Sequence, residues 1–207
     1  MNEAAEPLAD LKLYMLLLGS KAPQRNVEQH DYFFGVARSL KELVPEIKAF
    51  WPEAGTSIHI DGWREVNYVE GYQIKAALKE EPTALGEGEN VLIADTAGLA
   101  PKSLFFINLG GYQENILEEQ HYIVLTVQDD RAQATQHAKK TVFFKKNSIK
   151  GANSHIDEKY GIDVDDIYRI EEILSTSQKE RFQINISPVE ESAADQVHLG
   201  YFKLDKL

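Results

Sequence analysis

The sequence predicts an α+β fold made of two internally duplicated β-β-α-β-β halves, packed about a pseudo-twofold axis and closed by an extra C-terminal strand. Three observations predict this fold. Polar triplets recur at a fixed offset, similar helix-start residues follow each copy, and apolar runs of strand length flank both. We place the first half at residues 1–100 and the second half, with the closing strand, at 101–207, fused into one structural domain.

The duplication is visible as an offset of 91 residues. Glu28-Gln29-His30 returns as Glu119-Gln120-His121 (121 − 30). Further along, an offset of 96 (155 − 59) pairs His59-Ile60-Asp61 with His155-Ile156-Asp157. The change of offset implies a five-residue insertion (96 − 91) in the second half. Such an insertion costs little, because loop-closure entropy grows slowly with length.

Each half reads as two strands, a helix and two further strands. The runs "LYMLLLG" and "LFFINLG" predict buried first strands, and "YIVLTVQ" is rich in β-branched residues. The expected elements of the first half are strands at 12–18, 32–37, 71–78 and 90–96 with a helix at 40–51. Those of the second half are strands at 104–109, 122–127, 167–173 and 182–187 with a helix at 131–144. The two polar triplets then fall in loops ahead of the second strands.

Helix starts and the closing strand are predicted from local chemistry. Ser39 with Glu42 forms a capping box, and Asp130 with Gln133 supplies the same groups in the second half. Pro45 should kink the first helix or split it into two turns. The final segment "VHLGYFKL" resembles the opening strand, and we expect it to cover an unpaired sheet edge.

Composition and charge exclude several functional classes. The 207-residue chain has no cysteine, which removes disulfides, thiolate ligands and cysteine nucleophiles. A net charge of −11 argues against nucleic acid and membranes as partners, because phosphate binding normally rests on clustered lysine and arginine. The acidic N-terminus and the short apolar runs predict a cytoplasmic protein. The chain also lacks the motifs of nucleotide-binding loops and nucleophile elbows.

Seven segments of the chain carry a resemblance to a known family. They are "LLLG", "NVEQHDYFFGVARSL", "FWPE", "HIDGW", "LFFINLGGY", "HIDEKYGIDVDDIYRI" and "HLGYFKL", and they cover nearly the whole chain. Together they resemble the bacterial domain of unknown function 1543, whose members carry this duplication. The resemblance implies no activity, ligand or catalytic residue.

The candidate site is a polar set that occurs twice. Its members are Glu28, His30, His59 and Asp61, then Glu119, His121, His155 and Asp157. Residues i and i+2 of an extended segment share a face, so His59 and Asp61 should point the same way. Two imidazoles and a carboxylate in each half match the donor set of a metal triad. The alternative is structural, since such groups also satisfy buried polar atoms.

Three further residues distinguish the first half. Asp31 adds a carboxylate where the second half has Tyr122, and Trp63 with Arg64 offers contacts for a planar or anionic ligand. Core packing and a surface ion pair are the alternative roles of Trp63 and Arg64. The candidate binding residues are therefore His30, Asp31, His59, Asp61, Trp63, Arg64, His121, His155 and Asp157.

Two functions remain open at this level. The first is a non-catalytic binding or interaction protein, whose partner is an unknown small molecule or protein, with a homodimer as one form. The second is a metal-assisted or histidine general-base enzyme at the repeated motifs. We favour the first, because an enzyme needs convergent groups, and we assign no catalytic residue, no metal ligand and no cofactor.

Overall fold

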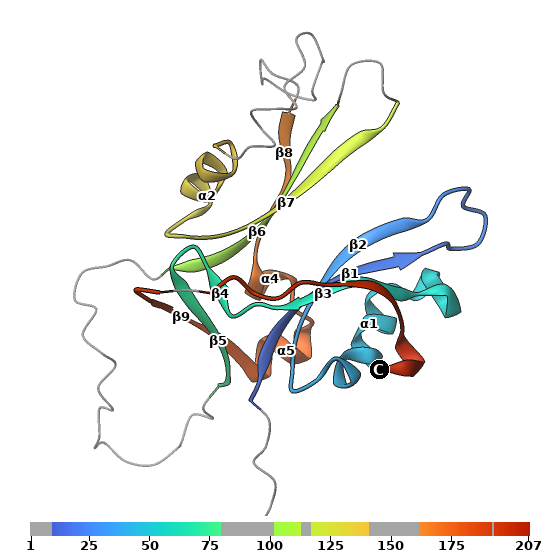
Figure 1. The fold of residues 1–207 in the computed structure, drawn as a ribbon, viewed down its shortest axis with the longest axis horizontal. Helices are drawn as coiled ribbons and strands as arrows, with labels where there is room; N and C mark the ends of the chain where they lie inside the picture. Colours follow the sequence, from blue (N-terminus) through green and yellow to red (C-terminus); the bar gives the residue numbers. More distant parts are fainter. Residues whose placement is uncertain (1–9, 80–101, 113–116, 141–161, 192) are drawn as a thin grey trace, which may run out of the picture. The chain divides into compact units, whose positions relative to one another are not determined.

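The computed structural model describes residues 10–79, 102–112, 117–140, 162–191 and 193–207, which form an α+β fold made mostly of strands (Figure 1). These residues fall into two compact units. Unit 1 comprises the described residues of 1–79 and 174–207, and unit 2 those of 80–173. Each unit has its own sheet and its own core.

Unit 1 is built on a four-stranded antiparallel sheet in the order β10-β3-β1-β2 (Figure 1). Its strands are β1 (Lys12–Ser20), β2 (Gln29–Ala37), β3 (His59–Glu65) and β10 (His198–Lys203). The C-terminal strand pairs with β3 and covers that edge of the sheet, as the sequence predicts. Leu16 of β1 and Ile60 of β3 are fully buried on the face that carries the core.

The helix predicted at 40–51 is split, as Pro45 leads us to expect. Its pieces are the 3-10 turn η1 (Leu40–Leu43) and the helix α1 (Val44–Phe50), and the 3-10 segment η2 (Pro52–Ser57) follows. Pro45 lies in the first turn of α1, where its missing N–H costs no helical hydrogen bond. Leu43 and Ile47 then pack onto the core face of the sheet.

A second, three-stranded sheet completes unit 1, in the order β4-β5-β9. Its strands are β4 (Tyr68–Val69), β5 (Tyr72–Leu78) and β9 (Phe182–Pro188). The helix α5 (Thr176–Arg181) precedes β9 and carries the buried Gln178. The Gln178 amide accepts the Val36 N–H at 2.8 Å and donates to the Val36 carbonyl at 3.2 Å, which ties α5 to β2.

Unit 2 carries a three-stranded antiparallel sheet in the order β7-β6-β8 (Figure 1). Its elements are β6 (Ser103–Tyr112), β7 (Glu119–Gln128), α2 (Arg131–Ala138), β8 (Ile162–Arg169) and α4 (Ile170–Ile173). Phe105, Ile107 and Leu109 are fully buried and pack against Ala134 and Ala138 of α2. One helix therefore covers one face of this sheet.

The two predicted helix starts differ in their capping. Ser39 makes no side-chain cap bond, and the Glu42 carboxylate accepts the Arg38 N–H at 2.9 Å instead. Asp130 does cap α2, because its carboxylate accepts the Gln133 N–H at 2.8 Å. The capping prediction is confirmed for the second half and is wrong for the serine of the first.

The strand predicted at 167–173 ends early, and a helix takes over. β8 stops at Arg169, where the Glu172 carboxylate accepts the Arg169 N–H at 3.0 Å and pairs with Arg131. That backbone bond, with the Arg131 guanidinium, lowers the pKa of Glu172. The expected strand at 90–96 and the expected helix end at 141–144 lie outside the described residues. No helix in the described ranges is long and apolar enough to cross a bilayer.

Candidate functional site

His30, Gly19 and His59 lie side by side across three strands of unit 1. Gly19 of β1 pairs with His30 of β2 on one side and with His59 of β3 on the other. Strand register therefore places both imidazoles on one face, flanking a residue without a side chain. Since β2 begins at Gln29, His30 belongs to the strand and not to the loop that the sequence predicts.

Two carboxylates complete a set of four that we call the His/carboxylate cluster: Glu28, His30, His59 and Asp61. His59 Nε2 lies 3.1 Å from Asp61 Oδ1 and 3.2 Å from Glu28 Oε1. His30 Nε2 lies 3.1 Å from Asp61 Oδ2 and 4.0 Å from Glu28 Oε2. His59 and Asp61 thus point the same way, as the i, i+2 spacing predicts.

His59 is the buried member of the cluster. Its side chain is 4% exposed, against 46% for His30, and its Nδ1 lies 2.9 Å from the Ser57 carbonyl oxygen. A carbonyl oxygen only accepts hydrogen bonds, so Nδ1 carries a proton and Nε2 faces the carboxylates. Without a further cation, Nε2 would present a lone pair to two anionic oxygens. A proton or a metal ion is therefore needed between them.

Gly19 and a β-bulge make room for these side chains. A Cβ at Gly19 would lie 2.6 Å from His59 Nε2 and closer still to Asp61 Oδ2. The β1–β3 register shifts between Leu17 and Leu18, so Asp61 is an extra residue that turns onto the face of His59. Asp61 Oδ2 is buried and makes no well-aligned hydrogen bond, although the His30 ring is near.

Tyr201 of β10 covers the cluster from the neighbouring edge strand. Its ring centroid lies 4.2 Å from that of His59, and 63% of Tyr201 is exposed. Tyr201 also lines a pocket of about 560 Å³ with Lys48 and Lys203. Sequence reasoning missed Tyr201, because only the pairing of β10 with β3 brings residue 201 to residue 59.

Asp31 does not join the cluster, although it follows His30 directly. Neighbouring residues of a strand face opposite sides of the sheet, and Asp31 pairs with Leu18, whose side chain lies in the core. The Asp31 carboxylate accepts the Tyr32 N–H at 2.7 Å. The interpretation of Asp31 as an extra site carboxylate therefore does not fit the strand geometry.

Trp63 and Arg64 also lie away from the cluster. Trp63 packs against the core, and its ring stacks on His198 with the centroids 3.9 Å apart. Arg64 pairs with Met15, four residues before Gly19, or about 13 Å along β1. Burial lowers the pKa of Arg64. The packing role of Trp63, which the sequence left open as an alternative, fits its surroundings.

Unit 2 has a similar row of residues in its own sheet, in which a central glycine pairs with one residue on each neighbouring strand. Gly110 of β6 pairs with His121 of β7 and with Asp163 of β8. The β6–β8 register shifts between Asn108 and Leu109, which are 91 residues (109 − 18) beyond the shifted pair of β1. The whole polar triplet lies within a strand in unit 2, since β7 begins at Glu119, whereas in unit 1 Glu28 precedes β2. The two sheets are thus alike in strand order and in the position of the bulge.

The counterpart of Asp61 in unit 2 is Asp165. Both are the extra residue of the bulged strand, one opposite β1 and the other opposite β6, an offset of 104 (165 − 61). Sequence spacing predicts Asp157 for this position, eight residues earlier (165 − 157), because it matches the His-Ile-Asp letters. His155 and Asp157 themselves lie outside the described residues.

Contacts around Asp165 are longer and more exposed than those of the His/carboxylate cluster. His121 Nδ1 lies 3.5 Å from Asp165 Oδ2, and its Nε2 lies 3.8 Å from Glu119 Oε2. The His121 side chain is 50% exposed. Asn108 also donates to Asp165 Oδ2 at 3.4 Å. Unit 2 therefore holds a looser version of the same arrangement.

The side chains of the His/carboxylate cluster contact one another directly in this structure. Among the described residues, no group of three or more histidine, aspartate or glutamate side chains could hold a metal ion as they stand. In unit 1 the donors contact one another directly, at 3.1 and 3.2 Å around His59 Nε2. Ligands bonded to one ion at ~2.1 Å are themselves roughly 3.0–3.4 Å apart. These donor pairs already have the spacing of metal ligands, but the set as a whole does not hold an ion as it stands, so a movement such as rotation of the partly exposed Glu28 side chain would have to admit one.

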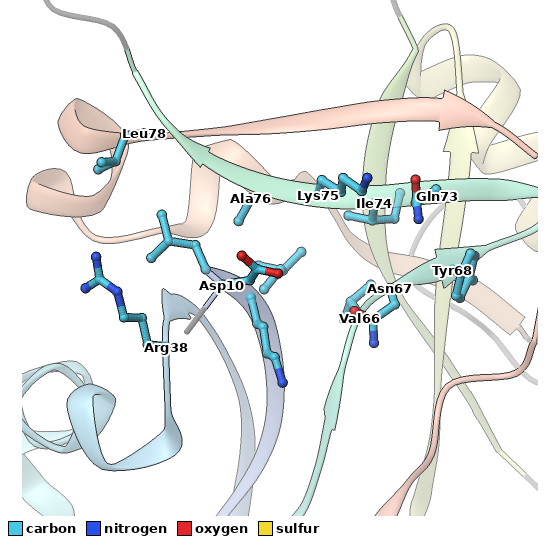
Figure 2. A pocket seen from close by; sticks show the side chains of 13 residues that line it. Asp10, Arg38, Val66, Asn67, Tyr68, Gln73, Ile74, Lys75, Ala76 and Leu78 are labelled. Carbon is cyan, nitrogen blue, oxygen red and sulfur yellow. The ribbon is translucent and has the colours of Figure 1, made fainter. Parts of the chain in front are cut away.

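A larger pocket lies at the other end of β1 and was not anticipated from the sequence. Its volume is about 620 Å³. Figure 2 shows Asp10, Arg38 and Lys75 around it, with apolar side chains of β5 along one wall. Lys12, which also lines it, is seven residues (19 − 12) from Gly19, or about 23 Å along the strand. The pocket is therefore separate from the His/carboxylate cluster.

Fold and site together define an α+β protein with a histidine–carboxylate cluster on one face of an antiparallel sheet. Residues 25–76 match the family model described as Domain of Unknown Function (DUF1543). This match confirms the family resemblance for that segment. It contains all four residues of the His/carboxylate cluster.

A solved structure is similar to nearly the whole chain. It is described as the crystal structure of a protein Il1583 from Idiomarina loihiensis, and the two chains are 21% identical. The similarity covers 94% of this chain and 98% of that one, with a TM-score of 0.52. At this level of identity the similarity shows the fold alone. No protein with curated annotation matches the chain.

Proposed function

We propose that unit 1 is a binding module for a divalent transition-metal ion, held by Glu28, His30, His59 and Asp61. The proposal rests on the position of His59 Nε2, 3.1 Å from Asp61 Oδ1 and 3.2 Å from Glu28 Oε1. Because His59 Nδ1 donates to Ser57, these three atoms are all acceptors when His59 is neutral. Two imidazoles and two carboxylates are a donor set that suits Zn²⁺, Mn²⁺ or Fe²⁺.

Charge balance supports a dication at this place. With both imidazoles neutral, the carboxylates of Glu28 and Asp61 bring two negative charges, which one divalent ion neutralises. Neutrality matters because His59 is almost fully buried, and an uncompensated charge beside it would be costly. Protons on both imidazoles would balance the same charge, so protons and metal ions compete for these donor atoms.

The residues around the cluster support the same proposal. The Ser57 carbonyl fixes the tautomer of His59, as a carbonyl behind a metal-bound imidazole does. Gly19 leaves the space over β1 free of a side chain. Tyr201 covers one side of the His59 ring and shields it from water. These contacts orient the donors without occupying Nε2 or Asp61 Oδ2.

Titration of chelator-treated protein with Zn²⁺ and with Mn²⁺, followed by calorimetry, tests the proposal. We expect saturable binding by the wild type and a roughly 100-fold loss of affinity in Asp61→Asn, which removes a donor charge. The matched control is Asp165→Asn, which changes the corresponding carboxylate of unit 2 and should leave the affinity unchanged. A wild type without saturable binding, or an Asp61→Asn variant that binds equally well, would contradict the proposal. The cluster would then be a structural network held by protons.

We also infer that the sheets of the two units derive from one duplicated element. Support comes from the matching orders β3-β1-β2 and β8-β6-β7 and from bulges 91 residues apart. Packing about a pseudo-twofold axis, a cytoplasmic location and a homodimer stay predictions. A metal-assisted or general-base enzyme also stays a prediction, because no observation places a reacting group beside the cluster.

A further inference from the structure

We propose that the 620 Å³ pocket of unit 1 binds a small organic monoanion, a carboxylate with an apolar body, whose charged end is held by Arg38. We call it the Arg38 pocket. The residues that the proposal uses are Asp10, Lys12, Arg38, Ile74, Lys75 and Ala76. This proposal is independent of the metal proposal, because the pocket and the His/carboxylate cluster share no residue.

The walls of the Arg38 pocket combine apolar side chains with polar and charged ones. Leu13, Val66 and Ile74 line it and are 2%, 1% and 3% exposed. Figure 2 shows Ile74 and Ala76 of β5 on one side, with Val66 on the facing segment. A volume of this size lies within the range of roughly 300–1,000 Å³ that is typical of small-molecule sites. The apolar part of the wall can take the body of a ligand, while the polar part holds its charged end.

Arg38 supplies the polar group that points to an anion. Its Nε is buried and has no hydrogen-bond partner. The backbone N–H of Arg38 holds the Glu42 carboxylate, and no ion pair to the Arg38 guanidinium occurs within the described ranges. A buried guanidinium N–H without an acceptor is unfavourable, and a carboxylate supplies acceptors in the fork geometry that arginine prefers.

The remaining charges around the pocket indicate a monoanion. Lys12 is already bound to Glu65, with Nζ and Oε1 2.7 Å apart. Lys75 is exposed and adds a second positive charge, whereas Asp10 is the one carboxylate among the lining residues. Arg38 and Lys75 against Asp10 leave one net positive charge. A ligand with one negative charge neutralises this net charge, whereas a phosphate dianion would leave one negative charge uncompensated.

NMR titration of the full chain with hexanoate and benzoate tests the proposal. We expect saturable shifts of the backbone amides of Ile74 and Ala76 with both carboxylates, and at least tenfold weaker binding in Arg38→Gln. Arg25→Gln is the matched control, since Arg25 is an exposed arginine outside the pocket. Ala76→Leu should weaken binding by filling the pocket while Arg38 is intact.

Three outcomes would overturn the proposal. They are the absence of saturable shifts with both carboxylates, equal binding of hexanol, and unchanged affinity in Arg38→Gln. Inorganic phosphate that binds more tightly than hexanoate would contradict the assignment of the ligand as a monoanion. If Arg38→Gln fails to fold, Ala76→Leu decides, because unchanged hexanoate affinity in that variant would place the ligand elsewhere.

Discussion

The two units build similar rows of paired residues around a central glycine, but different residues flank the glycine in each unit. In unit 1 the glycine is flanked by His30 and His59, and in unit 2 by His121 and Asp163. The bulged aspartate lies 3.1 Å from histidine nitrogens in unit 1 and 3.5 Å in unit 2. Strand register, and not the repeated letters of a motif, therefore decides which side chains meet.

The histidines of the two rows also differ in how deeply they are buried. The His59 side chain is 4% exposed and lies under Tyr201, whereas the His121 side chain is 50% exposed. Donors held out of water attract a cation more strongly than donors surrounded by it. If both rows derive from one ancestor, only unit 1 has the arrangement for which we propose ion binding. The first three predictions below compare matched positions of the two units.

The largest expected effect comes from filling the glycine positions. Gly19→Ala should weaken Zn²⁺ binding more than about 100-fold, because its Cβ displaces His59 and Asp61. Gly110→Ala would bring a Cβ within 2.8 Å of the Asp165 carboxylate, yet it should leave the affinity within about threefold of wild type. Calorimetric titration of both variants measures the difference. Equal losses would show that unit 2 contributes to the same binding.

Replacing the matched histidines with alanine should affect the stability of the protein more in unit 1 than in unit 2. His59→Ala removes a buried ring and leaves the Ser57 carbonyl without its partner, so we expect a loss of about 1–3 kcal/mol in the free energy of unfolding. His121→Ala changes an exposed side chain and should cost less than about 0.5 kcal/mol. Urea denaturation of the chelator-treated variants provides the comparison. A larger loss of stability in His121→Ala than in His59→Ala would contradict the conclusion that the histidine of unit 1 is the better-packed of the two.

The helix starts of the two halves offer a smaller contrast. Asp130→Ala removes the acceptor for the Gln133 N–H and should destabilise unit 2 by about 1 kcal/mol. Ser39→Ala should be nearly neutral, because the Ser39 side chain makes no cap bond. Hydrogen exchange of the amides of α2 and α1 reports the two effects separately. A substantial loss of protection in Ser39→Ala would mean that the serine caps its helix after all.

The smallest expected effect is on the pH dependence of stability. The pKa of Glu172 is lowered, so its stabilising contribution is present above the ordinary value of 4.5 and is lost as the pH falls below it. Because this side chain is 40% exposed, we expect its contribution to be less than about 0.5 kcal/mol, and Glu172→Gln should reduce the stability difference between pH 6 and pH 3.5 by that amount. Denaturation curves of Glu172→Gln that follow those of the wild type at both pH 6 and pH 3.5 would contradict this account of α4.

In unit 1, burial raises the pKa of Tyr14 to about 12, so the stabilising contribution of the neutral Tyr14 side chain is lost at alkaline pH, between 10 and 12.

Most strands were predictable from the sequence, because apolar periodicity depends on neighbours along the chain. The runs at 12–18, 104–109 and 182–187 lie within β1, β6 and β9. The early end of the strand at 167–173 was not predictable in the same way. It depends on a hydrogen bond from Arg169 to Glu172 and on Arg131, which is distant in sequence.

The cluster was predictable in its members more than in its geometry. The repeated letters indicated His30, His59 and Asp61, and i, i+2 spacing correctly placed the last two on one face. Asp31 was grouped with the cluster because it follows His30, but the strand begins three residues (32 − 29) earlier than expected, and its backbone turns Asp31 to the other face. The equivalence of Asp165 with Asp61 depends on a bulge, which shifts register without leaving a recognisable sequence motif.

The metal content of the full chain tests the central claim most directly. Protein loaded with Zn²⁺, freed of excess ion and weighed by native mass spectrometry should carry one ion per chain. Asp61→Asn should carry none under the same conditions, and Asp165→Asn should still carry one. A wild-type chain that retains no ion would contradict the account of unit 1. Two ions per chain would contradict the difference drawn between the units.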